Sequence, residues 1–152
     1  MKIQIIFFAL IVLVSTLPVK GLTQTRPFNG ANKIIASFNG NSDSLMKKML
    51  TYFADKGYSV EAVDKNLGVI KTGEKFPVKT LVSVKINAIV KDNTITFTGL
   101  RKSRNGNGPT IGQNYREITC GGIWSSEQKD AWDELNKVVQ GIKPTAITYA
   151  KN

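Results

Sequence analysis

The sequence predicts an α+β fold: a two-layer sandwich in which an antiparallel sheet of about five or six strands carries two helices packed on one face. Two segments with apolar residues at helical spacing indicate the helices, and short alternating segments between them indicate the strands. Consecutive strands joined by short turns pair antiparallel, and each helix must bury its apolar stripe. A helical layer on one face of the sheet is therefore expected.

The N-terminus has the pattern of a signal peptide. Lys2 provides a positive start, residues 3–17 are apolar or small, and Pro18 ends the run. The run has 15 residues, fewer than the ~20 that a membrane-spanning helix needs. We predict a cleaved signal peptide at residues 1–21 and export to the periplasm or the medium, since no Cys follows the run to carry a lipid anchor.

The mature chain is expected to hold one domain at residues 33–141, after a flexible lead-in at 22–32 that is polar and rich in turn formers. Residues 33–38 predict a first strand, and residues 44–56 predict a helix that Ser42 or Asp43 caps and that Gly57 ends. Its apolar positions share one stripe: Leu45, Met49, Tyr52 and Phe53.

The middle of the chain alternates in the manner of strands. Residues 58–63 and 67–72 predict a hairpin, and residues 80–90 and 94–100 predict two longer strands joined by a turn at Asp92. One face of the longest strand is apolar: Val82, Val84, Ile86, Ala88 and Val90. The other sheet face is expected to be solvated or to bind something: Lys85, Asn87, Thr94, Thr96 and Thr98.

A basic, glycine-rich stretch, RKSRNGNGPTIGQNYR, occupies residues 101–116. Its glycines match neither common phosphate-loop pattern, and Pro109 removes an amide that such a loop would use, so we expect a long connection between strands. A short strand is expected at 115–119.

The second helix is expected at 126–140, because Ser125 and Gln128 have capping-box spacing and Gly141 follows the last apolar position. Its stripe comprises Ala131, Trp132, Leu135, Val138 and Val139, and Asp130 and Glu134 are assigned to its solvated polar side. Residues 142–152 contain Pro144 and no clear period, so we expect a C-terminal tail.

Composition restricts the possible chemistry. The sequence has no histidine and a single cysteine, Cys120, so the commonest general base, an intramolecular disulfide and a zinc site built on these residues are all disfavoured. We expect Cys120 to be a structural thiol. The S-x-x-K at Ser44 and the K-T-G at Lys71 resemble two motifs of penicillin-binding enzymes, but the S-D-N element between them is absent and the chain is too short for that fold.

The charge predicts an acidic partner. Removal of the signal peptide leaves 19 basic and 11 acidic residues, a formal charge of +8. Such a charge either keeps the protein soluble or attracts it to anionic lipid and polysaccharide. Nucleic acid is disfavoured, because no predicted strand combines basic residues with base-stacking aromatic residues.

The order of elements resembles a known group of domains. The segment KIIASFNGNSDSLMKKMLTYFADKGYSVEAVDKNLGVIKT, then DNTITFTGL and the helix near SSEQKDAWDEL, are similar to exported bacterial domains of unknown function with a TATA-binding-protein-like, or helix-grip-like, α+β fold. They are distantly similar to the repeated domains of the lipoprotein C component of the outer-membrane barrel-assembly machinery. The resemblance covers residues 33–141 and implies a non-enzymatic envelope domain, but it carries over no binding residue.

These observations predict an exported, monomeric, non-enzymatic binding domain of the cell envelope without a cofactor or a metal. Protein or an anionic envelope component is the expected partner, with peripheral membrane contact included. The candidate contact residues for that partner are the cations of the basic stretch: Arg101, Lys102, Arg104 and Arg116. The alternative is a carrier or sensor module that holds a small apolar ligand between the sheet and the C-terminal helix.

Overall fold

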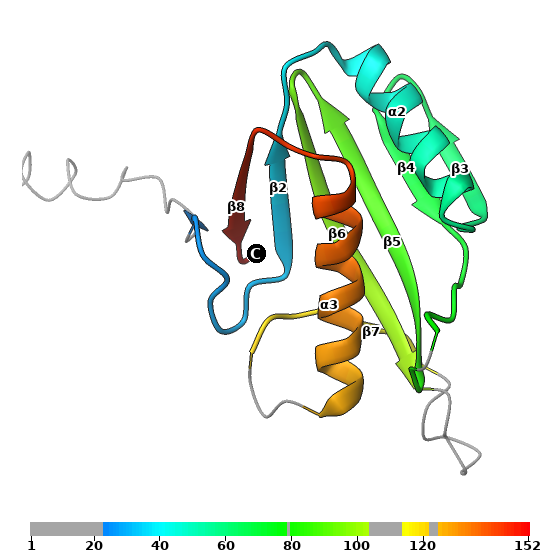
Figure 1. The fold of residues 1–152 in the computed structure, drawn as a ribbon, viewed down its shortest axis with the longest axis vertical. Coiled ribbons are helices and arrows are strands. Elements are labelled where there is room, and N and C mark those ends of the chain that lie inside the picture. Colours follow the sequence, from blue (N-terminus) through cyan, green and yellow to red (C-terminus); the bar gives the residue numbers. More distant parts are fainter. Residues whose placement is uncertain (1–22, 79, 104–113, 122–124) are drawn as a thin grey trace, which may run out of the picture.

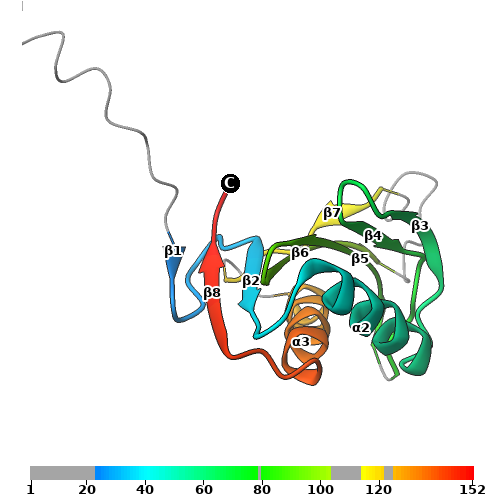
Figure 2. The ribbon, with the colours of Figure 1, turned by 90° about the horizontal axis from the view of Figure 1, so that it is seen from above.

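The computed structural model describes residues 23–78, 80–103, 114–121 and 125–152, which form one antiparallel sheet with both helices on the same face (Figure 1, Figure 2). The predicted two-layer α+β sandwich is therefore confirmed. The predicted signal peptide lies outside the described residues. Within them, no helix is both long enough and apolar enough to cross a membrane.

The elements follow one another as strand, strand, helix, four strands, a short strand, helix and strand. In chain order they are β1 (Thr23–Gln24), β2 (Lys33–Ser37), α2 (Ser42–Asp55), β3 (Val60–Asp64), β4 (Val69–Thr72), β5 (Val82–Lys91), β6 (Thr94–Ser103), β7 (Arg116–Glu117), α3 (Ser126–Gly141) and β8 (Ala146–Ala150). In the sheet the strands lie in the order β1-β8-β2-β6-β5-β4-β3, and β7 pairs with the far end of β6.

The core lies between the sheet and the two helices. The predicted apolar face of β5 is buried throughout, with exposed fractions of 0–4%. Against it and its neighbours pack the buried apolar residues of α3: Ala131, Trp132, Leu135, Val138 and Val139. This stripe is the predicted one. These side chains belong to one buried cluster between the sheet and α3.

Both helices begin at a capping side chain. Ser125 accepts a hydrogen bond from the backbone N–H of Gln128 at 3.2 Å, as the capping-box spacing predicted. At α2 the cap is Asn41, whose side chain accepts from Ser44 N–H at 2.9 Å, so the predicted Ser42 or Asp43 cap is wrong. The helix consequently starts two residues earlier than expected.

The first and last described segments of the chain both belong to the sheet. The segment 142–152, expected as a tail, contains β8, which pairs with β2 over five residues from Lys33↔Ala150 to Ser37↔Ala146. β1, within the expected flexible lead-in, pairs with the other edge of β8. The prediction of a tail outside the domain is therefore wrong, because Pro144 precedes the strand and β2 supplies the hydrogen-bonding partner that this short segment needs.

Candidate functional site

The four predicted contact cations are divided by the pleat of β6. This strand runs to Ser103 instead of ending at residue 100, so Arg101 and Lys102 are neighbours within a strand and project to opposite faces. Arg116 in β7 lies directly opposite Arg101, and residues opposite each other share a face. Arg104 lies outside the described residues. The structure therefore brings Arg101 and Arg116 together and separates Lys102 from them.

Arg101 faces the first turn of α3. Its Nη1 lies 3.7 Å from Oε2 of Glu127, and the other oxygen of that carboxylate accepts a hydrogen bond from the Ser103 hydroxyl at 2.6 Å. The Arg101 side chain is only 12% exposed, and its buried Nε has no hydrogen-bond partner among the described residues. Sequence reasoning missed Glu127 and Ser103, because the pairing depends on a strand that continues past its predicted end.

Burial and a neighbouring positive charge both lower the pKa of Arg101. Burial lowers the pKa of the Arg101 guanidinium, Glu127 opposes that change, and the nearby charge of Arg116 lowers it further. Arginine nevertheless stays charged at neutral pH. Within the described chain Arg101 forms an ion pair with Glu127 and Arg116 forms none. The two neighbouring guanidinium groups therefore have one carboxylate partner between them.

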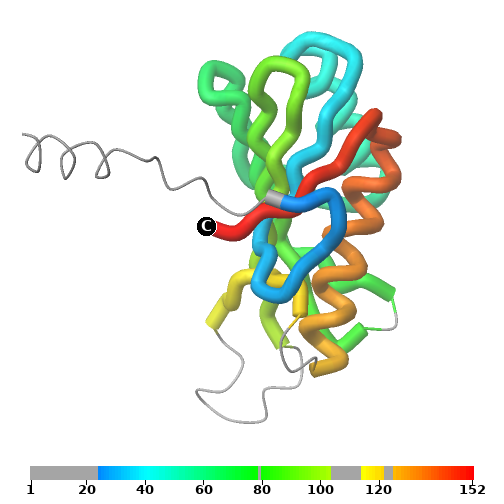
Figure 3. The backbone as a smooth tube through the Cα atoms, turned by 90° about the vertical axis from the view of Figure 1, so that its left-hand side faces the viewer, coloured from blue at the N-terminus to red at the C-terminus, as the bar shows by residue number. Residues whose placement is uncertain are grey.

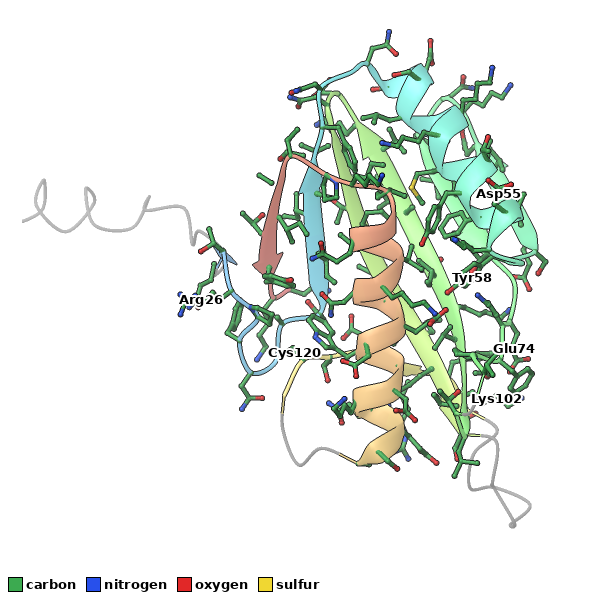
Figure 4. All side chains as sticks on the ribbon, viewed as in Figure 1. Arg26, Asp55, Tyr58, Glu74, Lys102 and Cys120 are labelled. Carbon is green, nitrogen blue, oxygen red and sulfur yellow. The ribbon has the colours of Figure 1, made fainter. Side chains whose placement is uncertain are left out.

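Lys102 belongs to a different cluster on the open face of the sheet. The Nζ atoms of Lys85 and Lys102 lie 5.2 and 5.8 Å from the ring centroid of Tyr115. Glu61 accepts a hydrogen bond from Lys85 at 2.9 Å, and Glu74, labelled with Lys102 in Figure 4, adds to burial in raising the pKa of Tyr115. Acidic residues thus accompany the lysines of this open-face cluster.

Glu134 is buried, which corrects its assignment to the solvated side of the second helix. It is 7% exposed and accepts a hydrogen bond from the Tyr58 hydroxyl at 2.6 Å, while Lys75 Nζ lies 3.3 Å away (Tyr58 is labelled in Figure 4). Lys75 Nζ also lies 3.8 Å from the Tyr58 ring centroid. The sequence contains a pattern that predicts this burial, because position 134 shares a helix face with the apolar residues Ala131, Leu135 and Val138.

This buried cluster has the electrostatics of a structural link. Burial alone would raise the pKa of Glu134, but the Tyr58 hydrogen bond and the charges of Lys75 and Lys137 outweigh it, so the pKa lies below its usual value. Burial and the same carboxylate raise the pKa of Tyr58 far above its usual value. At neutral pH the carboxylate is therefore ionised and the phenol is neutral, which ties α3 to the start of β3.

The residues that resemble catalytic motifs have structural partners. The Ser44 hydroxyl donates to the Asn41 carbonyl, and the buried Thr72 hydroxyl accepts from the Ile86 backbone N–H at 2.9 Å. Cys120 is 7% exposed, burial raises the pKa of its thiol, and its backbone pairs with Gly30 and Ala31. The thiol therefore stays protonated in a packed position.

Among the residues that the structure describes, no group of three or more His, Cys, Asp or Glu side chains is arranged to hold a metal ion. Comparison of the chain with protein-family models and with curated proteins finds no match.

Proposed function

We propose that this chain is an exported, non-enzymatic, monomeric domain of the cell envelope that binds an anionic envelope component. The contact is centred on Arg116, supported by Arg101, and includes Arg104, another cation of the basic stretch. The observation that carries the proposal is the pair of guanidinium groups opposite each other on β6 and β7, of which only Arg101 has an acidic partner in the described chain.

An anion bound at this pair would compensate the excess charge. Guanidinium groups bind carboxylate, phosphate and sulfate groups through paired N–H donors, and such charge-assisted hydrogen bonds are stronger than neutral ones. The Nε of Arg101 is buried, so the accessible donors of the pair are chiefly those of Arg116, whose side chain is exposed. Lys102 is left out of the contact, because it projects to the open face beside Tyr115.

The leader pattern and the resemblance to exported bacterial domains support an envelope location. The structural roles of Ser44, Thr72, Cys120 and Glu134 support a function in binding instead of catalysis, because each of these groups is engaged in capping, pairing or packing. Intact mass of the protein purified after expression of the full chain tests export directly, since cleavage should remove residues 1–21.

The binding site is tested with a charge-matched pair of double variants. Arg104→Gln with Arg116→Gln removes two cations from the proposed contact, and Arg26→Gln with Lys71→Gln removes two exposed cations elsewhere. Arg101 is retained, because its removal would leave Glu127 without its ion-pair partner. We expect the first variant to weaken binding to phosphatidylglycerol vesicles and to heparin by about tenfold or more, and the control by less than about twofold.

Equal losses in the two variants would show that net charge alone drives the binding, and the proposed site would then be rejected. Binding of the wild type that does not weaken as salt is raised would reject it as well, since contacts between exposed charges are screened.

A further inference from the structure

A groove of about 850 Å³ lies at the opposite end of β5 from Arg101, between α2 and the β3–β4 turn. Figure 3 shows the β2–α2 connection, the β3–β4 turn and the β5–β6 turn together at this end of the molecule. The volume is within the ~300–1,000 Å³ that small-molecule sites usually have. The groove is lined by Ser42, Asp43, Met46, Lys47, Leu50, Thr51, Lys65, Asn66, Leu67, Gly68, Ile89, Val90, Lys91 and Asp92.

Large apolar side chains form its walls. Met46 and Leu50 come from α2, and Leu67 comes from the β3–β4 turn. Leu67 is 70% exposed and Leu50 is half-buried, so both present apolar surface to solvent. The apolar surface is therefore available to a ligand.

The turn that presents Leu67 is held in place. The side chain of Asp64 accepts hydrogen bonds from the backbone N–H groups of Asn66 and Leu67, at 2.9 and 3.0 Å. Gly68 has a positive φ of 67°, and its carbonyl accepts from Val90 N–H at 2.8 Å. The backbone at Leu67 is thus held by hydrogen bonds before any ligand binds, which reduces the backbone entropy lost on binding.

Three lysines stand at the rim of the groove. Lys47, Lys65 and Lys91 are exposed, and none of them forms an ion pair with a described residue. Two aspartates also line the groove. Asp43 lies in the first turn of α2, where the helix dipole already compensates a negative charge, and Asp92 lies in the β5–β6 turn. The rim is therefore suited to an anion beside an apolar surface.

We propose that this groove binds a single-chain fatty acid, with the acyl chain against Met46, Leu50 and Leu67 and the carboxylate near the three lysines. The inference goes beyond the anionic contact at Arg116, which lies at the other end of the sheet. It places an apolar ligand outside the packed space between the sheet and α3.

Titration calorimetry with dodecanoate below its micelle concentration tests the proposal on the protein purified after export of the full chain. Dodecanoate should bind, each two-carbon shortening of the chain should weaken binding by at least about threefold, and dodecyltrimethylammonium should bind at least about tenfold more weakly. Equal binding of the cationic and anionic amphiphiles would overturn the role of the lysines.

Matched variants locate the site. Leu67→Ser should weaken dodecanoate binding by about tenfold, and Leu81→Ser, at an exposed leucine outside the groove, should change it by less than about twofold.

The lysines are tested together. The triple variant Lys47→Gln, Lys65→Gln and Lys91→Gln should weaken the binding of dodecanoate but not that of neutral dodecyl maltoside. The control triple Lys71→Gln, Lys143→Gln and Lys151→Gln should affect the binding of neither. The Arg104 and Arg116 variant should bind dodecanoate as the wild type does, which separates this proposal from the proposed function.

Two further outcomes would overturn the inference. If sedimentation showed a dimer that Leu67→Ser abolishes, a second copy of the chain would be the occupant. If the methyl resonances of Leu67 and Met46 did not shift when dodecanoate was added, the fatty acid would be bound elsewhere.

Discussion

Glu134 keeps its charge at a position where burial opposes it. Tyr58 and Lys75 compensate the lost hydration, since one donates a hydrogen bond to the carboxylate and the other contributes a cation at 3.3 Å. A buried carboxylate held in this way stabilises the fold only while it is ionised. The cluster therefore predicts a particular dependence of stability on pH.

We expect Glu134→Gln to lower the free energy of unfolding at neutral pH by about 1–3 kcal/mol, because Tyr58 and Lys75 lose a charged partner. The folded-state pKa of Glu134 lies below its unfolded value, so its contribution is complete above the unfolded pKa, near 4.5, and is lost as the pH falls through the folded pKa. Urea unfolding of both proteins from pH 7 down to about 3 should show the difference shrinking.

Asp133→Asn on the same helix is the control. The Asp133 side chain is 55% exposed and its partner Lys129 is 62% exposed, and such surface ion pairs contribute at most about 1 kcal/mol. If the cost of Glu134→Gln stayed constant down to pH 3, ionisation of Glu134 would not be the source of its stabilising effect.

Two glycines with the same backbone conformation should respond differently to substitution. Gly57 and Gly68 have φ values of 71° and 67°, but a Cβ at Gly57 would meet no heavy atom within 4 Å, whereas one at Gly68 would lie 2.1 Å from the Val90 carbonyl oxygen. Gly57→Ala should cost about 1–2 kcal/mol of backbone strain, and Gly68→Ala should cost at least about 2 kcal/mol more. Thermal unfolding of the two variants measures the difference, and equal costs would mean that the turn moves away from β5.

These residues also show where sequence reasoning was sufficient. Gly57 could be predicted from its place after a helical stripe, because that role is local. The roles of Gly68 and Glu134 could not be predicted from local rules alone, because one depends on the approach of β5 and the other on residues 76 and 59 positions away along the chain.

Strands β5 and β6 form the centre of the sheet, and β3 forms its outer edge. All ten residues of β5 pair with β6, whereas every residue of β3 is exposed and the pairing of β3 with β4 contains an irregularity between Val60 and Ala62. Glu61 and Asp64 lie on this edge strand, and charges at an edge oppose pairing with another chain. The edge strand β3 should therefore be locally less stable than the central strands β5 and β6.

Amide hydrogen exchange should show that difference. We expect the amides of β3 to exchange through local opening, at least about tenfold faster than those at the centre of β5 and β6, which should exchange only with global unfolding. Val60→Thr serves as a control, because a change at an exposed edge position should leave the protection of β5 unchanged. Uniform protection across β3, β5 and β6 would show instead that the edge strand unfolds only with the whole sheet.

At the element scale the sequence predicted both helices, the apolar stripe of α3 and the β5–β6 hairpin, since each is a long segment with a clear period. It placed the end of β6 three residues too early, because Arg101, Lys102 and Ser103 are polar and only their cross-strand partners Val82, Ser83 and Val84 identify them as strand residues. That small error changed the site, because pairing in a strand sends Arg101 and Lys102 to opposite faces.

At the scale of the whole molecule, the first and last described segments of the chain pair with each other at one edge of the sheet. β8 lies between β1 and β2, so the last residues of the chain pair with the first described residues, as at Thr23↔Ala150. Tyr149 in β8 is buried, with its ring 6.1 Å from that of Trp132 in α3. The domain therefore extends over residues 23–152, and the expected boundaries at 33 and 141 would remove part of its sheet.

A fragment of residues 33–141 should consequently fail to fold cooperatively, whereas a chain of residues 23–152 should show one unfolding transition. Loss of β8 exposes the five paired residues of β2 and removes Tyr149 from the core, and a sheet cannot replace either contact locally.

Substitutions in β8 measure its contribution in the intact chain, which an unfolded fragment does not. Tyr149→Ala should lower the free energy of unfolding by about 3–5 kcal/mol, as loss of a large buried side chain does. Thr148→Ala, at the half-buried neighbour in β8, should cost less than about 1 kcal/mol. If residues 33–141 unfolded with the same midpoint as residues 23–152, or if the two β8 variants cost the same, β8 would be an addition to the domain and not part of its folding unit.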